Sequence, residues 1–111
     1  MYSFHDELCS FVGQLESVAD DKSLASLWFV REYLMSQFCD KEKVQYEFFK
    51  WLDSNRQKII SRLDEVFNFS VRGEIANIIN QIRDIWKTLP QEDRDVVWQW
   101  LDHFSSLSIA Q

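Results

Sequence analysis

The histidines and cysteines are the residues of this chain best suited to bind a metal ion. His5 and Cys9 are four residues apart, a spacing that places two ligands on one helix face, as in zinc sites. Cys39 and His103 lie far away in the sequence, and no CxxC pair completes a ligand set. We therefore expect a surface histidine and a half-buried thiol at the first two positions, with no metal and no cofactor.

Catalysis by a serine or cysteine nucleophile needs a neighbouring base and an orienting acid. The chain has no nucleophile elbow, and its 2 glycines leave no Gly-rich loop for a phosphate. Adjacent carboxylates such as Asp20 and Asp21 fit the charge that is favourable at helix starts. A triad assembled only by the fold is the remaining route to catalysis, so the sequence favours a protein that is not an enzyme.

The net charge of −6 limits the partners of this chain. An acidic protein is repelled by phosphate backbones and anionic lipid surfaces, so neither nucleic acid nor a membrane is an expected partner. Residues 1–40 carry seven acids and two bases, residues 41–89 seven acids and nine bases, and residues 90–111 four acids and one base. The bases of the middle region scatter over several helix faces, whereas a DNA-reading helix presents a one-sided basic stripe.

The scarcity of glycine and proline, the residues that form most turns, indicates the fold class. An all-β domain needs frequent glycine and proline turns, and this chain of 111 residues has 2 Gly and 1 Pro. Its length suits one domain, covering residues 1–111. We expect an all-α fold, a compact antiparallel bundle of about five helices joined by short links. From the apolar periodicity, the expected helices cover residues 3–19, 22–39, 41–67, 70–89 and 91–107.

Local signals mark several ends of these helices. Ser3 and Ser70 are suited to cap the first and fourth helices, and Asp40 the third. Pro90 ends the fourth helix and fits the first turn of the fifth, whereas residues 108–111 are expected to fray. Asn55 interrupts the stripe of the third helix, but the stripe keeps its phase, so one long helix is favoured over a bend at that point.

The segment 22–39 is apolar on most of its sides, which is typical of a central helix surrounded by others. Phe29 and Tyr33 lie off its main face and form a weaker candidate for partner binding, but covered positions are favoured because a central helix is surrounded on all sides. Arg31 projects into the apolar face. Because a lone buried guanidinium is very costly, we expect Arg31 to be a buried polar group paired with a carboxylate or with carbonyls.

Trp98 is the candidate binding residue among the many aromatic side chains. It lies two residues from Trp100, so both rings cannot face one core, and the helix period turns Trp98 outward. Asp95 and Asp102 lie one turn to either side, and an exposed tryptophan among acids is typical of a binding hot spot. The alternative is that a neighbouring helix covers Trp98. Further candidate acids of the binding site are Glu92, Asp93, Asp6 and Glu7.

These patterns favour a non-catalytic, protein-binding domain. Its most concrete form is a small acidic inhibitor of the immunity-protein type, which would neutralise a basic protein such as a toxin nuclease. The alternative is a structural homodimer or assembly subunit with aromatic side chains at its interface. The sequence has no recognisable secretory signal or membrane span, and its cysteines fit free thiols, so a cytoplasmic protein is expected.

Overall fold

Short polar turns divide the chain into seven helical segments within the residues that the structure describes. The structure is a computed structural model that describes residues 4–67 and 75–110. In chain order the segments are α1 (Phe4–Val18), α2 (Asp21–Met35), α3 (Lys41–Ser54), α4 (Arg56–Ile60), the 3-10 helix η1 (Asp64–Phe67), α5 (Ala76–Trp86) and α6 (Gln91–Ala110). None of the described residues forms a strand, and the predicted all-α bundle is confirmed.

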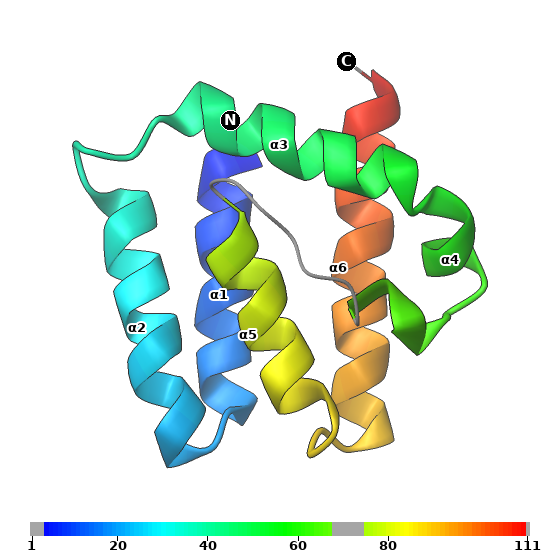
Figure 1. The fold of residues 1–111 in the computed structure, drawn as a ribbon, viewed down its shortest axis with the longest axis horizontal. Coiled ribbons are helices and arrows are strands. Elements are labelled where there is room, and N and C mark those ends of the chain that lie inside the picture. The colour runs from blue at the N-terminus through cyan, green and yellow to red at the C-terminus, as the bar shows by residue number, and fades with distance from the viewer. Residues whose placement is uncertain (1–3, 68–74, 111) are drawn as a thin grey trace.

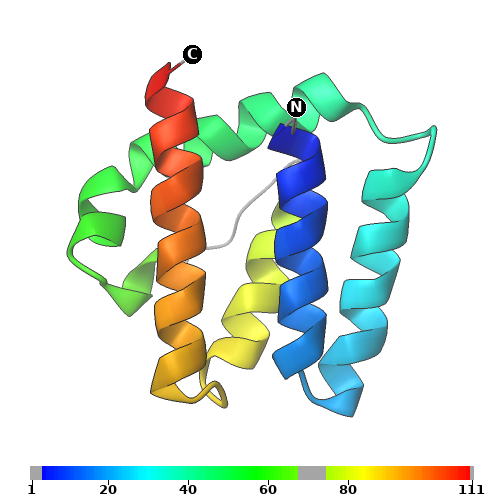
Figure 2. The same cartoon turned by 180° about the vertical axis from the view of Figure 1, so that it is seen from behind.

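Four of the helices form the body of the bundle. α1, α2, α5 and α6 lie side by side with alternating chain directions (Figure 1). Seen from behind, α1 lies between α2 and α6 (Figure 2). α3 crosses the ends of these helices instead of lying alongside them (Figure 1). Its buried stripe of Val44, Phe48 and Leu52 therefore closes one end of the core.

Aspartates begin two of the helices. The side chain of Asp20 accepts a hydrogen bond from the Ser23 amide at 2.8 Å, and Asp40 accepts one from the Lys43 amide at 3.1 Å. Both are N-caps that satisfy backbone amides left without a partner in the first helical turn. The predicted cap at Asp40 is confirmed.

We expect Asp20→Ala to lower the melting temperature by a small amount near neutral pH. The hydrogen bonds from Ser23 hold the pKa of Asp20 below its ordinary value. The stabilisation by this carboxylate is therefore present above the unfolded-state pKa and is lost as the pH falls through the lower, folded-state pKa. Thermal unfolding should be measured from neutral pH down to about pH 2. The gap in melting temperature between the variant and the wild type should narrow as the pH falls. Asp20→Asn, a cap that does not titrate, is the control, and a gap of constant size would contradict this account.

The predicted long helix over 41–67 is wrong, because the chain leaves the helical path at Asn55. The Asn55 amide is shared between the carbonyls of Trp51 and Leu52, and its side-chain nitrogen donates to the Trp51 carbonyl at 2.9 Å. Asparagine side chains compete in this way with helical hydrogen bonding. α4 follows as little more than one turn, and the alternative of a bend at Asn55 describes the structure better.

A second turn, at Arg62, directs the chain back toward α6. Arg62 has a φ of 56°, in the left-handed region that usually favours glycine. Its amide bonds the Ile59 carbonyl at 3.1 Å and the Leu63 amide bonds the Lys58 carbonyl at 2.9 Å, which together form a Schellman motif. Bonds from the Arg62 side chain to Ile59 and Asp102 hold this conformation. η1 follows and packs toward the core.

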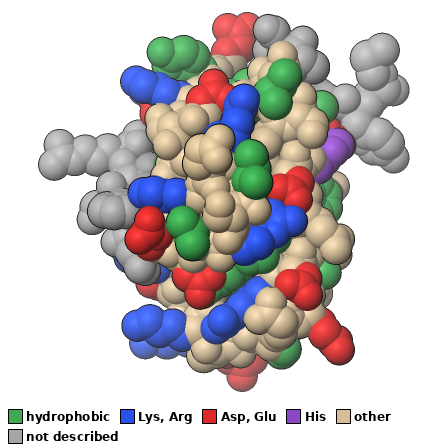
Figure 3. Space-filling view, turned by 90° about the vertical axis from the view of Figure 1, so that its right-hand side faces the viewer, with side chains coloured by type: hydrophobic (Ala, Val, Ile, Leu, Met, Phe, Trp, Pro, Cys, Tyr) green, Lys and Arg blue, Asp and Glu red, His purple; other side chains and the backbone are tan. Residues whose placement is uncertain are grey.

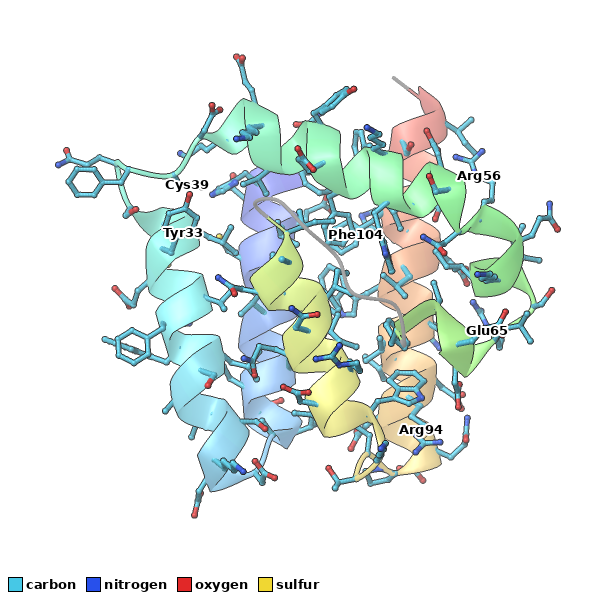
Figure 4. The ribbon with its side chains drawn as sticks, in the orientation of Figure 1. Tyr33, Cys39, Arg56, Glu65, Arg94 and Phe104 are labelled. Carbon is cyan, nitrogen blue, oxygen red and sulfur yellow. The ribbon has the colours of Figure 1, made fainter. Side chains whose placement is uncertain are left out.

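Aromatic rings fill the core in two groups, which Trp51 links through its contacts with Phe48 and Phe67. Phe104 is fully buried at the centre of the first group, with ring centroids 5.3–5.7 Å away in Phe4, Phe11, Phe48 and Trp100. Its side chain lies between the helices, beneath α3 (Figure 4). The second group contains Phe67, Trp86 and Trp98, and joins η1, α5 and α6. These ring contacts fix the crossing of α3 and the return of η1.

α2 is not the central helix that its composition predicts. It contacts α1 and α5 and forms one edge of the bundle (Figure 1). Only Leu27, Val30 and Leu34 of α2 are buried, and its other large apolar side chains face outward. α2 also ends at Met35, before the predicted Cys39, because Ser36 has an extended conformation.

The remaining helix ends differ from the prediction by a few residues. α5 ends at Trp86, and α6 begins directly after Pro90, as predicted. α6 continues to Ala110, so the fraying expected from Ser108 is wrong for residues 108–110. The predicted caps Ser3 and Ser70, and the predicted link between the third and fourth helices, lie outside the described residues.

Candidate functional site

Trp98 is a core residue. Its side chain is 3 % exposed, and its ring centroid lies 5.5 Å from that of Phe67 and 5.3 Å from that of Trp86. The Arg62 guanidinium lies 5.6 Å from the centroid of the same ring. The prediction that Trp98 points to solvent is wrong, and the alternative of a covering neighbour holds. Trp98 therefore cannot anchor a partner while the domain is folded.

The break near Asn55 explains this burial. The predicted single helix over 41–67 could not wrap around α6, whereas the broken chain turns twice and places Phe67 against Trp98. α6 is consequently covered on both flanks of its buried stripe of Val97, Leu101 and Phe104. Trp98 lies on the flank toward η1 and α5, and Trp100 lies on the flank toward α1.

The two aspartates predicted around Trp98 have partners within the fold. Asp102 accepts two hydrogen bonds from Arg62, at 2.9 and 2.6 Å, and this contact raises the pKa of Arg62. Asp95 accepts one from the Gln91 side chain at 2.9 Å. On the side of the bundle with α4 and α6, acidic and basic side chains are interspersed (Figure 3). On that side, the described acidic side chains do not form a large continuous patch of negative charge, and the basic side chains do not form a positive one.

The other predicted acids form two groups at opposite ends of the bundle. Asp6 and Glu7 lie in the first turn of α1, and Glu92 and Asp93 in the first turn of α6. Because α1 and α6 run in opposite directions, these two turns are at opposite ends of the pair (Figure 2). Glu7 lies 2.7 Å from Nε2 of His103 on α6. The structure therefore does not bring the four acids into one cluster.

A groove between α1 and α6 contains the aromatic side chain that the sequence assigned to the core. Trp100 is only partly buried, and its indole N–H donates to the side chain of Gln14 across the groove. This bridge separates two hollows. The hollow nearer the start of α1 is polar and lined by Glu7, Gln14, Val96, Gln99, Trp100 and His103. The second, of about 260 Å³, is lined by Phe11, Gln14, Leu15, Ser17, Val18, Asp93, Val96, Val97 and Trp100.

The two helices that form this α1–α6 groove are acidic. Glu7 and Asp93 line its hollows. Glu16 and Asp102 face away from it and pair with Arg31 and Arg62. α1 carries three carboxylates and no lysine or arginine, and α6 carries four carboxylates and one arginine. Seven acids less one base give these two helices a net charge of −6, equal to that of the whole chain. The one arginine, Arg94, donates to the Trp86 carbonyl at 2.8 Å and lies over the Trp86 ring. Asp93 lines the apolar hollow itself.

The outer face of α2 carries more large exposed apolar side chains than any other helix of the described residues. We define it as Leu24, Trp28, Phe29, Tyr33 and Met35. Phe29 is 67 % exposed, Met35 62 % and Trp28 46 %. Phe38, in the turn after α2, is more exposed still, at 81 %. For Phe29 and Tyr33 the sequence favoured covered positions over a weaker binding candidate, and the edge position of α2 leaves both exposed instead.

Arg31 pairs with a carboxylate, as predicted, but the pair is not deeply buried. Its Nε donates to Glu16 on α1 at 2.5 Å, and the two side chains are 30 % and 15 % exposed. The bond to Glu16 raises the pKa of Arg31. Because α2 is an edge helix, Arg31 lies where α1 and α2 meet and not in the interior. The pair ties these two helices together beside the outer face of α2.

His5 and Cys9 differ in how well they match the prediction. His5 is buried, against the expected surface position, and its Nε2 contacts the Leu34 carbonyl at the end of α2. Cys9 is half-buried, as expected, and this burial is the main cause of a raised thiol pKa, with Asp6 and Cys39 adding to it. A raised pKa reduces the thiolate fraction and therefore the reactivity of Cys9. Tyr33 and Cys39 lie near the turn from α2 into α3 (Figure 4).

Residues 4–67 and 75–110 contain neither a candidate metal site nor a candidate membrane span. No group of three or more His, Cys, Asp or Glu side chains in this part of the chain could hold a metal ion. Of the helices described, none combines the length and the apolar character needed to cross a membrane. Comparison with protein-family models, with curated proteins and with solved structures finds no match to this chain.

Proposed function

We propose that this chain is a non-catalytic protein-binding domain that captures a basic partner in the α1–α6 groove. The observation that carries the proposal is the concentration of the net charge of −6 on the two helices beside an apolar hollow with a tryptophan wall. Acidic surfaces speed the approach of basic partners, and an apolar anchor held in a pocket slows their release.

The residues that line the groove indicate which side chains a partner would place in it. The apolar hollow suits one large aliphatic or aromatic side chain, because Phe11, Leu15 and Val97 are buried and Trp100 forms one wall. Asp93 lies at the same hollow, so lysine or arginine next to the anchor would pair with it. An amphipathic helix with an apolar stripe and basic flanks has this pattern and suits a groove between two helices.

The most concrete form of this function is a small acidic inhibitor of the immunity-protein type. It would cover a cationic surface, such as the nucleic-acid-binding face of a toxin nuclease. What supports this form is the acidic charge of α1 and α6, with Glu7 and Asp93 lining the groove between them. The acids at the ends of the groove, Glu7 and Asp93, are two of the residues that the sequence singled out. In this proposal the tryptophan that contacts the partner is Trp100 instead of Trp98.

A pair of synthetic peptides tests the proposal. Both are amphipathic helices with the same leucine stripe, one flanked by lysines and the other by glutamates. Fluorescence anisotropy of the labelled peptides should show saturable binding of the lysine peptide, at least about tenfold tighter than the glutamate peptide, and weaker at high salt. Equal affinities, or no saturable binding, would contradict the proposal.

Matched variants locate the binding to the groove. Glu92→Gln with Asp93→Asn removes two adjacent acids beside the groove, and Asp64→Asn with Glu65→Gln removes two on η1. Both double variants change the net charge by the same amount. We expect the first to weaken binding of the lysine peptide several-fold more than the second. Val18→Lys, at the exposed edge of the apolar hollow, should weaken it further.

A further inference from the structure

We propose that the outer face of α2 is a self-association surface, on which two copies of this chain pair about a two-fold axis. The exposed apolar side chains of α2 form a continuous surface rather than isolated contacts. The rings of Trp28 and Phe29 meet edge to face, with centroids 5.2 Å apart. Large exposed apolar surfaces on small domains mark interaction sites.

Hollows on both sides of α2 extend this surface. Between α1 and α2 lies a hollow lined by Glu16, Asp21, Leu24, Ala25, Trp28 and Phe29. Between α2 and α5 lies another, of about 270 Å³, lined by Ser26, Phe29, Val30, Tyr33, Leu34, Asn77, Ile78 and Gln81. Phe29 lines both and stands as a ridge between them. A ridge flanked by two hollows can interdigitate with an identical surface.

The charges of α2 favour a second copy as the occupant. α2 carries two acids, Asp21 and Glu32, and two bases, Lys22 and Arg31, so its net charge is zero. The net charge of −6 lies instead on α1 and α6, and pairing through the α1–α6 groove would oppose two acidic surfaces. Pairing through α2 opposes far less charge. With Glu16, which lines the first hollow and pairs with Arg31, the surface carries three acids and two bases, a net charge of −1, so repulsion offsets little of the burial of the rings.

The position of the rings along α2 also suits a two-fold axis. α2 runs over 15 residues from Asp21 to Met35, and Trp28 is its midpoint. An axis beside Trp28 lets two antiparallel α2 helices overlap along their whole length and brings the Trp28–Phe29 pairs of both copies together. Such a contact is isologous, meaning that one surface meets itself and the assembly closes at two chains. The α1–α6 groove stays open in this pair, so the inference is independent of the proposed function.

Sedimentation velocity over a range of protein concentrations tests this inference. We expect the average mass of the wild-type protein to rise from that of one chain toward that of two, and no higher, as the protein concentration increases through the micromolar range. Phe29→Glu should raise the dimer dissociation constant at least about tenfold, because it places a charge at the centre of the contact. Phe29→Ser, which removes the ring without adding charge, should raise it less but clearly.

Tyr46→Glu on α3 is the matched control, because Tyr46 is 65 % exposed and the charge change is the same. Far-UV circular dichroism checks that every variant retains its helix content. Tyr46→Glu should dimerise like the wild type. The inference is overturned if the wild-type chain stays monomeric at the highest concentration. It is also overturned if Tyr46→Glu weakens the dimer as much as Phe29→Glu. An assembly that grows beyond two chains overturns it as well.

Discussion

Trp98→Ala is expected to destabilise the fold by about 3–5 kcal/mol, the range for truncating a buried tryptophan. The substitution removes the ring that contacts Phe67, Trp86 and the Arg62 guanidinium, and leaves a cavity where η1, α5 and α6 meet. The Arg62–Asp102 pair holds the turn before η1 against α6, so we expect the surrounding elements to close the cavity only in part. Urea unfolding followed by far-UV circular dichroism measures the change.

Trp28→Ala is the control for this variant, because it truncates the same residue type at a 46 % exposed position. At low protein concentration, where the chain is monomeric, its cost should be about 1 kcal/mol or less. If Trp98→Ala had the same unfolding free energy as Trp28→Ala, Trp98 would not be packed in the core. It would then again be a candidate binding residue.

Phe104→Ala is expected to cost a similar amount, about 3–5 kcal/mol, for a different reason. Phe104 is completely buried and contacts rings from α1 and α3 as well as Trp100 on its own helix. It therefore supports both the packing of α3 across the bundle and the wall of the α1–α6 groove. We expect the loss of this ring to weaken binding of the lysine peptide as well as stability.

Phe29→Ala, at a position that is 67 % exposed, is the matched control for Phe104→Ala. Its unfolding free energy should stay within about 0.5 kcal/mol of the wild-type value at low concentration. Its affinity for the lysine peptide should be unchanged. If Phe104→Ala left stability unaffected, Phe104 would not be the packed centre of the first aromatic group.

Local signals in the sequence were sufficient for the starts of α3 and α6. Asp40 and Pro90 act through hydrogen bonds and steric limits within a few residues, so their effect can be read without knowing the fold. The left-handed turn at Arg62 has no such signal, because the usual residue there is glycine. What stabilises it is Asp102, 40 residues away in the chain.

The environment of a helix is not a local property, and this limited the prediction of the site. The sequence of α2 is apolar on most sides, which suits either a covered central helix or an edge helix with a binding face. The choice depends on how many neighbours the fold supplies, and α2 has helices on one side only. The assignment of Trp98 and Trp100 failed for the same reason, because it assumed that α6 has one buried side.

The acids of the site were identified from the sequence, but their arrangement was not. Glu7 and Asp93 do line the α1–α6 groove. Their grouping depends on α1 and α6, the first and last helices, lying side by side. No pattern within either helix indicates that neighbour relation.

The contact between Trp86 and Trp98 has an optical consequence. The two indoles lie 5.3 Å apart with their planes at 79°, and aromatic chromophores this close couple their electronic transitions. The circular dichroism spectrum of the native domain should therefore contain an exciton contribution superimposed on the signal of the peptide backbone. Its disappearance would report the separation of α5 from α6, even in a state in which both helices remain intact.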